Sequence, residues 1–301
     1  MGLHGSAPCP SGWRLLLAGI LATFLLGGCV IRVAYEQLDW LALWYLEDYF
    51  DLQPEQERVA REIVARTLAW HREEHLPRYA GLTRKVIDAV GTPVQPPFVA
   101  QRYAEAVLLW DELLARVLPD AAILLRSLTD EQVDELFANL AKENRDLAED
   151  FSGSTAAERR SKQDKVILKA FRRFTGRLNG AQETMVRART ARFHDLSDDW
   201  LRRRETWQQE FRRLLDARAT DPAFEVRLGQ LLLTPERFDS DDYRRQVADN
   251  RQSAFDLVAA VLNSLEAAQL QHLRDRLSTW ADDFDTLVRA GRKRSQPEPV
   301  T

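Results

Sequence analysis

The stretch Leu128–Phe151, which reads LTDEQVDELFANLAKENRDLAEDF, decides the fold class of this 301-residue chain. Its apolar residues recur every three or four positions and therefore share one face of a helix, while acids and amides fill most other positions. Those apolar residues are Val133, Phe137, Leu140, Leu147 and Phe151. The rest of the chain repeats this spacing, and no segment alternates apolar and polar residues over the length of a strand. The sequence therefore predicts an all-α protein.

Helical stripes of this kind usually face a hydrophobic core. A second one consists of Tyr103, Val107, Trp110, Leu114 and Val117. Prolines fall between stripes or at first-turn positions, where a helix tolerates them. We expect an elongated multi-helix bundle of about eight to ten helices.

The breaks within the chain are too short to separate domains. The most linker-like interior segments are Gly91–Pro97 and Ser152–Thr155. The last eleven residues contain three consecutive bases and two prolines. We therefore predict one helical domain over residues 29–290 and a disordered tail over residues 291–301.

Residues 1–28 have the composition of an export signal. They contain no acid and one base, Arg14, which is followed by a twelve-residue run rich in apolar side chains, Leu15–Leu26. Such a run is too short for a stable helix across a hydrocarbon core of roughly 30 Å, but it suits a signal peptide. The following Gly27-Gly28-Cys29 completes a sequence that resembles the lipobox of bacterial lipoproteins. An ordinary signal peptide and an uncleaved anchor are the alternatives.

The lipobox resemblance implies cleavage before Cys29 and acylation of its thiol, for example with palmitate. Each buried CH₂ contributes about 0.8 kcal/mol, so several chains attach the protein to a membrane durably. Val30 stands where an Asp would favour retention at the inner membrane, which points to the periplasmic face of the outer membrane. Cys9 would be removed with the signal and Cys29 would be acylated, so we expect no thiol for metal or redox chemistry. We expect no cofactor, and no contact with nucleic acid because an export signal removes the chain from it.

The residues after the lipobox carry a family resemblance. They include Tyr35–Leu52, Pro54-Glu55-Gln56, Trp70-His71, Leu76-Pro77 and Tyr79. Together they are similar to an uncharacterised family of proteobacterial envelope lipoproteins known by a domain-of-unknown-function label. The resemblance implies an envelope location and a helical fold, and it brings no established activity.

Charge is segregated along the chain. Residues 29–157 carry a net charge of −10, whereas residues 158–218 carry 17 bases and 9 acids, a net charge of +8. The basic segment could be a solvated surface that pairs with the acidic half, or a docking surface for an anionic envelope component or an acidic client. Its candidate contact residues are Arg159, Arg160, Lys169, Arg172, Arg173, Arg177, Arg202, Arg203 and Arg204.

Residues 35–50 are rich in aromatic side chains, which suit surfaces that are apolar at one end and wet at the other. We interpret this segment as a first core helix, with a membrane-apposed helix as the alternative. Trp40, Trp44 and Tyr45 are the candidate apolar complement of the basic surface.

Leu128–Gln132 resembles the Leu-Thr-x-x-Gln signature of small periplasmic stress chaperones. Partial matches occur at Leu52–Gln56, Leu233–Arg237 and Leu265–Gln269, with departures at the second or last position. The same residues also form a capping box, in which Thr129 and Gln132 bond to each other's backbone at a helix start. Helix initiation and a chaperone-like role are both compatible with the motif.

One segment resembles a metal site. In His71-Arg72-Glu73-Glu74-His75, the two His share a helix face, with the spacing of inverse zincins. They could hold zinc while Glu74 acts as general base, or they could border the core.

The sequence favours a non-enzymatic, outer-membrane-anchored helical protein that binds other envelope components or acts as a scaffold among them. A periplasmic chaperone-like client binder and a zinc-dependent hydrolase that uses His71, Glu74 and His75 are the alternatives.

Overall fold

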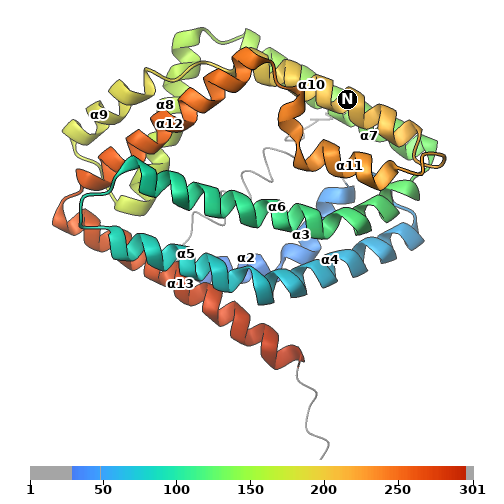
Figure 1. The fold of residues 1–301 in the computed structure, drawn as a ribbon, viewed down its shortest axis with the longest axis horizontal. Helices are drawn as coiled ribbons and strands as arrows, with labels where there is room; N and C mark the ends of the chain where they lie inside the picture. Colours follow the sequence, from blue (N-terminus) through green and yellow to red (C-terminus); the bar gives the residue numbers. More distant parts are fainter. Residues whose placement is uncertain (1–28, 48, 296–301) are drawn as a thin grey trace, which may run out of the picture.

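The computed structural model describes residues 29–47 and 49–295, and these residues are almost entirely helical (Figure 1). The prediction of an all-α fold is confirmed. The N-terminal part contains α2 (Cys29–Glu36), α3 (Leu38–Glu47), α4 (Pro54–Glu74), α5 (Leu76–Ala89), α6 (Pro96–Arg126) and α7 (Asp130–Ser152). The remainder contains α8 (Ala156–Thr175), α9 (Gly180–Thr190), α10 (Ser197–Asp216), α11 (Phe224–Leu233), the 3₁₀ turn η1 (Pro235–Phe238), α12 (Asp241–Asn263) and α13 (Ala267–Ser295).

These described residues form twelve α-helices, more than the eight to ten expected. The additional breaks are local. The chain bends at His75, between α4 and α5, because Pro77 in the first turn of α5 has no N–H to continue the hydrogen-bond ladder of α4. Proline is not a reliable boundary, however, since α6 continues through Pro119.

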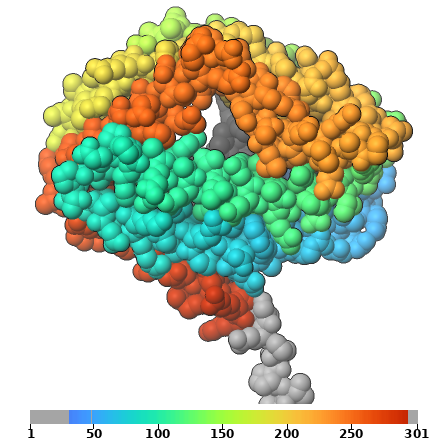
Figure 2. Space-filling view, viewed as in Figure 1, coloured from blue at the N-terminus to red at the C-terminus, as the bar shows by residue number. Residues whose placement is uncertain are grey.

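The helices form a frame around a central opening, which differs from the elongated bundle that we expected. Figure 2 shows this opening on one face, bordered by α6, α11 and α12. Hydrophobic contacts among the described residues fall into three clusters. One joins α6, α7, α10 and α11, a second joins α8, α9, α12 and α13, and a third joins α2, α5 and α13. The predicted stripe of α7 is confirmed, because Val133 is buried in the first cluster and Phe137 and Leu140 pack against it.

Two glutamines fasten the starts of α4 and α7 together. The side-chain Nε2 of Gln56 donates to Gln132 Oε1 at 3.0 Å, and Gln132 Nε2 donates back to Gln56 Oε1 at 2.8 Å. Each Nε2 also donates to a carbonyl just before the other motif, Gln56 to Ser127 and Gln132 to Asp51. Each Oε1 accepts from the backbone N–H three residues earlier, as in the predicted capping box at Thr129, which is confirmed.

The same arrangement joins α9 to α13. Gln182 and Gln269 exchange Nε2–Oε1 hydrogen bonds of 2.8 and 2.9 Å and donate to the carbonyls of Ser264 and Arg177. The motif at the start of α9, Leu178–Gln182, was not recognised in the sequence because Asn179 replaces Thr. In Figure 1 the starts of α4 and α7 lie at one end of the long axis, and the starts of α9 and α13 lie at the other. All four glutamine side chains are buried, so these hydrogen bonds fix two corners of the frame.

The stripe on α6 does not face a core along its first half. Tyr103, Val107 and Trp110 are exposed, and Trp110 is 58% accessible. The expectation that they are buried is wrong because α4, α11 and α12 cover the other faces of α6, where Leu109 and Ala122 are buried. The structure therefore leaves an apolar surface on the longest helix.

The C-terminal helix extends beyond the predicted domain boundary. Residues 291–295, which we expected in a disordered tail, form the last turn of α13, and residues 296–301 lie outside the described part of the chain. Basic residues such as Arg292 and Lys293 suit this position because they interact favourably with the carbonyl end of a helix.

In the described ranges, no helix combines the length and apolar character that crossing a membrane requires.

Candidate binding site

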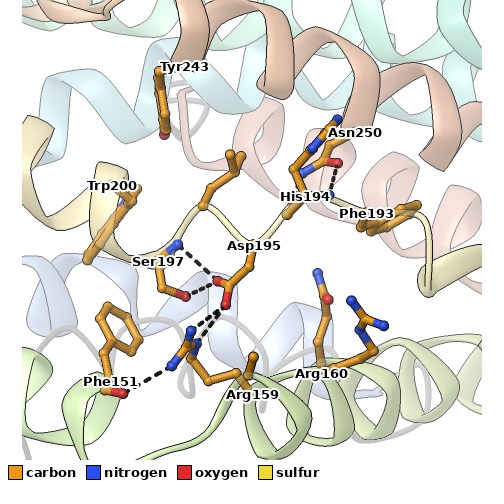
Figure 3. A pocket seen from close by; sticks show the side chains of 13 residues that line it. Phe151, Arg159, Arg160, Phe193, His194, Asp195, Ser197, Trp200, Tyr243 and Asn250 are labelled. Atoms are coloured by element: carbon orange, nitrogen blue, oxygen red, sulfur yellow. Dashed lines mark hydrogen bonds and ion pairs between the residues drawn. The ribbon is translucent and has the colours of Figure 1, made fainter.

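The predicted basic segment covers α8, α9 and α10, and part of it lines a pocket of about 380 Å³ (Figure 3). The floor of this pocket is the connection between α9 and α10, residues 191–196. Arg159 and Arg160 enter it from α8, and Trp200 enters it from α10. Tyr243 and Asn250 come from α12. With Phe151 at the end of α7, the lining comes from three parts of the chain that are distant in sequence: the α7–α8 region, the α9–α10 connection with the start of α10, and α12.

Arg159 and Asp195 organise the floor of the pocket. Arg159 Nε donates to Asp195 Oδ2 at 2.7 Å, and its Nη1 donates to the carbonyls of Phe151 and Ser154. The backbone N–H and the hydroxyl of Ser197 donate to Asp195 Oδ1. Burial opposes ionisation of Asp195, but the hydrogen bonds from Ser197 and Arg159 outweigh it and lower the pKa of this carboxyl below its usual value. Asp195 is therefore a fixed anion that orients Arg159.

Asn250 holds the other side of the floor. Its Oδ1 accepts from the His194 N–H at 2.7 Å, and its Nδ2 donates to the His194 carbonyl at 3.0 Å. This pair of bonds ties the α9–α10 connection to α12. The imidazole of His194 stays exposed, with its Nε2 3.5 Å from an Asp249 carboxylate oxygen.

Aromatic side chains provide the apolar part of the pocket. Phe151 and Trp200 lie edge to face, with ring centroids 6.4 Å apart, and Tyr243 and Trp200 face the α9–α10 connection opposite the arginines (Figure 3). Burial raises the pKa of the Tyr243 hydroxyl, which is therefore a donor at neutral pH. A cation, hydroxyl and amide groups and flat rings around a preformed space suit the binding of an anionic group attached to an apolar body.

The structure separates the predicted basic residues into two groups. Five form ion pairs, and besides Arg159 with Asp195 these include Arg172 with Glu183, Arg203 with Asp239, and Arg204 with Glu143. Arg202 pairs with Asp199 on the surface of α10, and Arg173 is half-buried over the ring of Phe174. Arg160, Lys169 and Arg177 are exposed and form no ion pair with another described residue, so their charges face solvent.

The predicted aromatic complement does not form one surface with the basic residues. Trp40 is exposed and stacks on Trp44, with ring centroids 6.3 Å apart, on α3. Tyr45 instead packs against the first hydrophobic cluster and touches Tyr49. Tyr49 donates to Glu143 at 2.6 Å, and Arg204 donates to the other oxygen of that carboxylate at 2.8 Å. Tyr45 and Arg204 thus belong to one internal network, not to a shared docking face.

The two histidines of the zinc-like motif lie together without Glu74. Their ring centroids are 5.2 Å apart, and His71 Nδ1 hydrogen-bonds to the Tyr35 hydroxyl at 2.9 Å. His75 is completely buried and has Glu112 3.4 Å from its Nε2, whereas Glu74 is exposed. Within residues 29–47 and 49–295, no three His, Cys, Asp or Glu side chains gather as a metal-binding group.

Sequence reasoning missed His194, Trp200, Tyr243 and Asn250. These residues line the pocket only because α12 packs against the α9–α10 connection, and no local sequence pattern predicts that contact.

The predicted signal peptide lies outside the described residues, and the described backbone begins with Cys29 at the start of α2.

Comparison with known proteins assigns the chain to a family but not to an activity. The model of a family of unknown function, DUF6279, matches residues 48–244. None of the curated proteins and none of the solved structures compared with the chain shows significant similarity to it.

Proposed function

The chain belongs to the DUF6279 family, whose function is unknown, and we propose that it is a lipid-anchored envelope protein that binds other envelope components without catalysing a reaction. The observation that carries this proposal is the pocket between α8, the α9–α10 connection and α12. It combines an oriented Arg159, an exposed Arg160 and the aromatic rings of Trp200 and Tyr243. Such a site favours an anionic partner.

The sequence supports the proposed attachment. Cleavage of a signal over residues 1–28 would leave the acylated Cys29 at the first position of α2, next to the folded frame. The proposed location is the periplasmic face of the outer membrane, where an acidic protein segment or another anionic envelope component is the expected partner.

Partner binding is tested by charge reversal at exposed positions that support no described ion pair. We expect Arg160→Glu, Lys165→Glu and Lys169→Glu together to remove specific partners from crosslinking in intact cells followed by mass spectrometry. The matched control reverses Lys142, Arg145 and Arg289, which are exposed on α7 and α13 and change the net charge equally. Identical partner profiles for the two triple variants would refute the proposed surface.

The anchor is tested separately by metabolic labelling with palmitate. We expect label in the wild-type protein and none in Cys29→Ser, which should also move from the membrane fraction to the soluble fraction. An unlabelled wild-type protein would refute lipid attachment, and label that persists in Cys29→Ser would place it elsewhere.

A chaperone-like role is the second candidate, and the exposed stripe of α6 favours it. Tyr103, Val107 and Trp110 form an exposed apolar stripe along α6. Exposed apolar patches on folded proteins commonly mark interaction sites. We expect the chain from residue 29 to suppress aggregation of an unfolded client, and Trp110→Ser to weaken this effect. Val226→Ser removes an equally exposed apolar side chain from α11 and serves as the control.

A further inference from the structure

A second cavity, far richer in apolar side chains than the pocket in Figure 3, lies among α2, α5 and α13. It measures about 540 Å³, within the range of small-ligand sites. Ile31 and Tyr35 line it from α2, Leu38 from the start of α3, Leu82 from α5 and Phe284 from α13. We propose that this groove binds a single long-chain fatty acid, with the hydrocarbon chain among these residues and the carboxylate next to Arg72.

The lining favours a hydrocarbon chain over a polar ligand. Its polar groups are largely occupied by bonds within the protein: the Tyr35 hydroxyl bonds to His71 Nδ1 at 2.9 Å, and Thr83 Oγ1 donates to the Tyr79 carbonyl at 2.8 Å. The remaining surface is aliphatic and aromatic. Burial of a flexible apolar chain there gains free energy in proportion to the area removed from water.

Charge complementarity identifies the polar end of the ligand. The guanidinium of Arg72 lies 5.3 Å from the centroid of the Tyr35 ring, which lines the groove. In the part of the chain that the structure describes, Arg72 forms no ion pair, and its Nε is buried without a hydrogen-bond partner. By contrast, Arg32 on α2 is engaged by Asp283, with Nε and Oδ1 3.0 Å apart. Arg72 is therefore the cation near this groove that a ligand carboxylate can satisfy.

Arg72 is held in place by its surroundings. The aliphatic part of its side chain passes so close to Gly291 of α13 that a methyl group there would clash with it. This contact and the neighbouring ring of Tyr35 limit the positions that the Arg72 guanidinium can take. A preorganised cation loses less conformational entropy when it binds a carboxylate.

The test uses the chain from residue 29 with Cys29→Ser, which contains every described helix but no acyl group. We expect oleate to bind with a stoichiometry of one in titration calorimetry, below its aggregation concentration. Arg72→Gln should weaken oleate binding roughly tenfold, as expected for loss of a charge-assisted hydrogen bond, and should leave the weaker binding of methyl oleate unchanged. Leu82→Trp should block both ligands because it fills the groove.

Val226→Trp adds the same side chain at an exposed site on α11 and should bind oleate normally. Circular dichroism and thermal melting verify that each variant is folded. Absence of oleate binding to the folded parent, or binding that survives in folded Leu82→Trp, would overturn the proposal.

A further arm compares this protein with the acylated form that begins at Cys29, in detergent. Equal oleate binding in both supports a free fatty acid as the occupant, whereas binding lost only in the acylated form would identify the chain on Cys29 as the occupant and overturn the proposal. These outcomes are independent of the partner profile, because the groove shares no lining residue with the pocket of Figure 3.

Discussion

Gln182 and Gln269 face each other through their carboxamides, and each side chain donates one hydrogen bond to the other and accepts one in return. Each carboxamide oxygen also accepts from a backbone N–H at the start of its own helix, and each nitrogen donates to a backbone carbonyl just before the start of the other helix. Loss of either glutamine leaves several buried polar groups without partners.

Gln269→Ala should therefore destabilise the protein by about 2–3 kcal/mol, the cost of unsatisfied buried donors and acceptors. Gln271→Ala, two positions further along α13, removes an exposed glutamine that bonds to Asp275 and should change stability by less than about 0.5 kcal/mol. Urea denaturation measures both. Equal stability of the two variants would contradict the structural role of the carboxamide pair.

The histidine cluster predicts a loss of stability in mild acid. Burial, the neighbouring His75 and the charge of Arg72 lower the pKa of His71 to about 4 from an ordinary value of 6.5. A base whose pKa is depressed by folding stabilises the native state above its unfolded pKa, and this contribution is lost as pH falls from about 6.5 to about 4. The total loss is on the order of 2–3 kcal/mol.

His71→Phe keeps a ring but cannot bind a proton, so its free energy of unfolding should decline less between pH 6.5 and pH 4 than that of the wild type. His194→Gln changes an exposed histidine outside the cluster and should retain the wild-type decline. Denaturant titrations at several pH values provide the measurement. A His71→Phe curve parallel to the wild type would exclude His71 as the source.

The ion pair between Arg204 and Glu143 is sheltered, since each side chain is less than 15% exposed. Arg204→Met should cost about 3–5 kcal/mol because it leaves the Glu143 carboxylate sheltered and without its cation. The double variant Arg204→Met with Glu143→Gln should recover part of this loss.

Arg212→Met breaks the pair with Asp134, in which both side chains are more than a third exposed, and should cost no more than about 1 kcal/mol. Chemical denaturation of the four proteins tests the difference. Similar losses for Arg204→Met and Arg212→Met would show that the network around Glu143 does not stabilise the fold.

Two glycines predict opposite effects of the same substitution. Gly91 has a φ of 99°, and a methyl group there would meet the guanidinium of Arg274, so Gly91→Ala should destabilise the protein by about 1–3 kcal/mol. Gly81 lies inside α5 with nothing near the site of an added methyl, so Gly81→Ala should stabilise it by about 0.5–1 kcal/mol. Melting temperatures that move in the same direction would contradict this assignment.

The fold class could be predicted from the sequence because the spacing of apolar residues is a local property. The stripe from Val133 to Leu140 lies on a helix and faces the first hydrophobic cluster, and the capping box at Thr129 has its predicted structure. The capping box at the start of α9 was not predicted because its N-cap residue is Asn179, whereas the N-cap residue of α7 is Thr129.

Long-range relations could not be predicted in this way. The sequence places Tyr103 and Trp110 on one face of α6, but only the positions of α4, α11 and α12 decide that this face remains exposed. The pocket beside Arg159 likewise depends on α12 meeting a loop that precedes it by about fifty residues, as the bonds between His194 and Asn250 show. Periodicity identifies what a helix can bury, whereas packing determines what it does bury.

The two carboxamide joints also constrain the order of assembly. Gln56 is separated from Gln132 by 76 positions, and Gln182 is separated from Gln269 by 87. Bringing residues this far apart together costs chain entropy before the hydrogen bonds can form. We therefore expect both glutamine pairs to form after the individual helices. A chain that emerges from a translocation pore N-terminus first would complete the α4–α7 corner before residue 269 arrives, and the α9–α13 corner would close last.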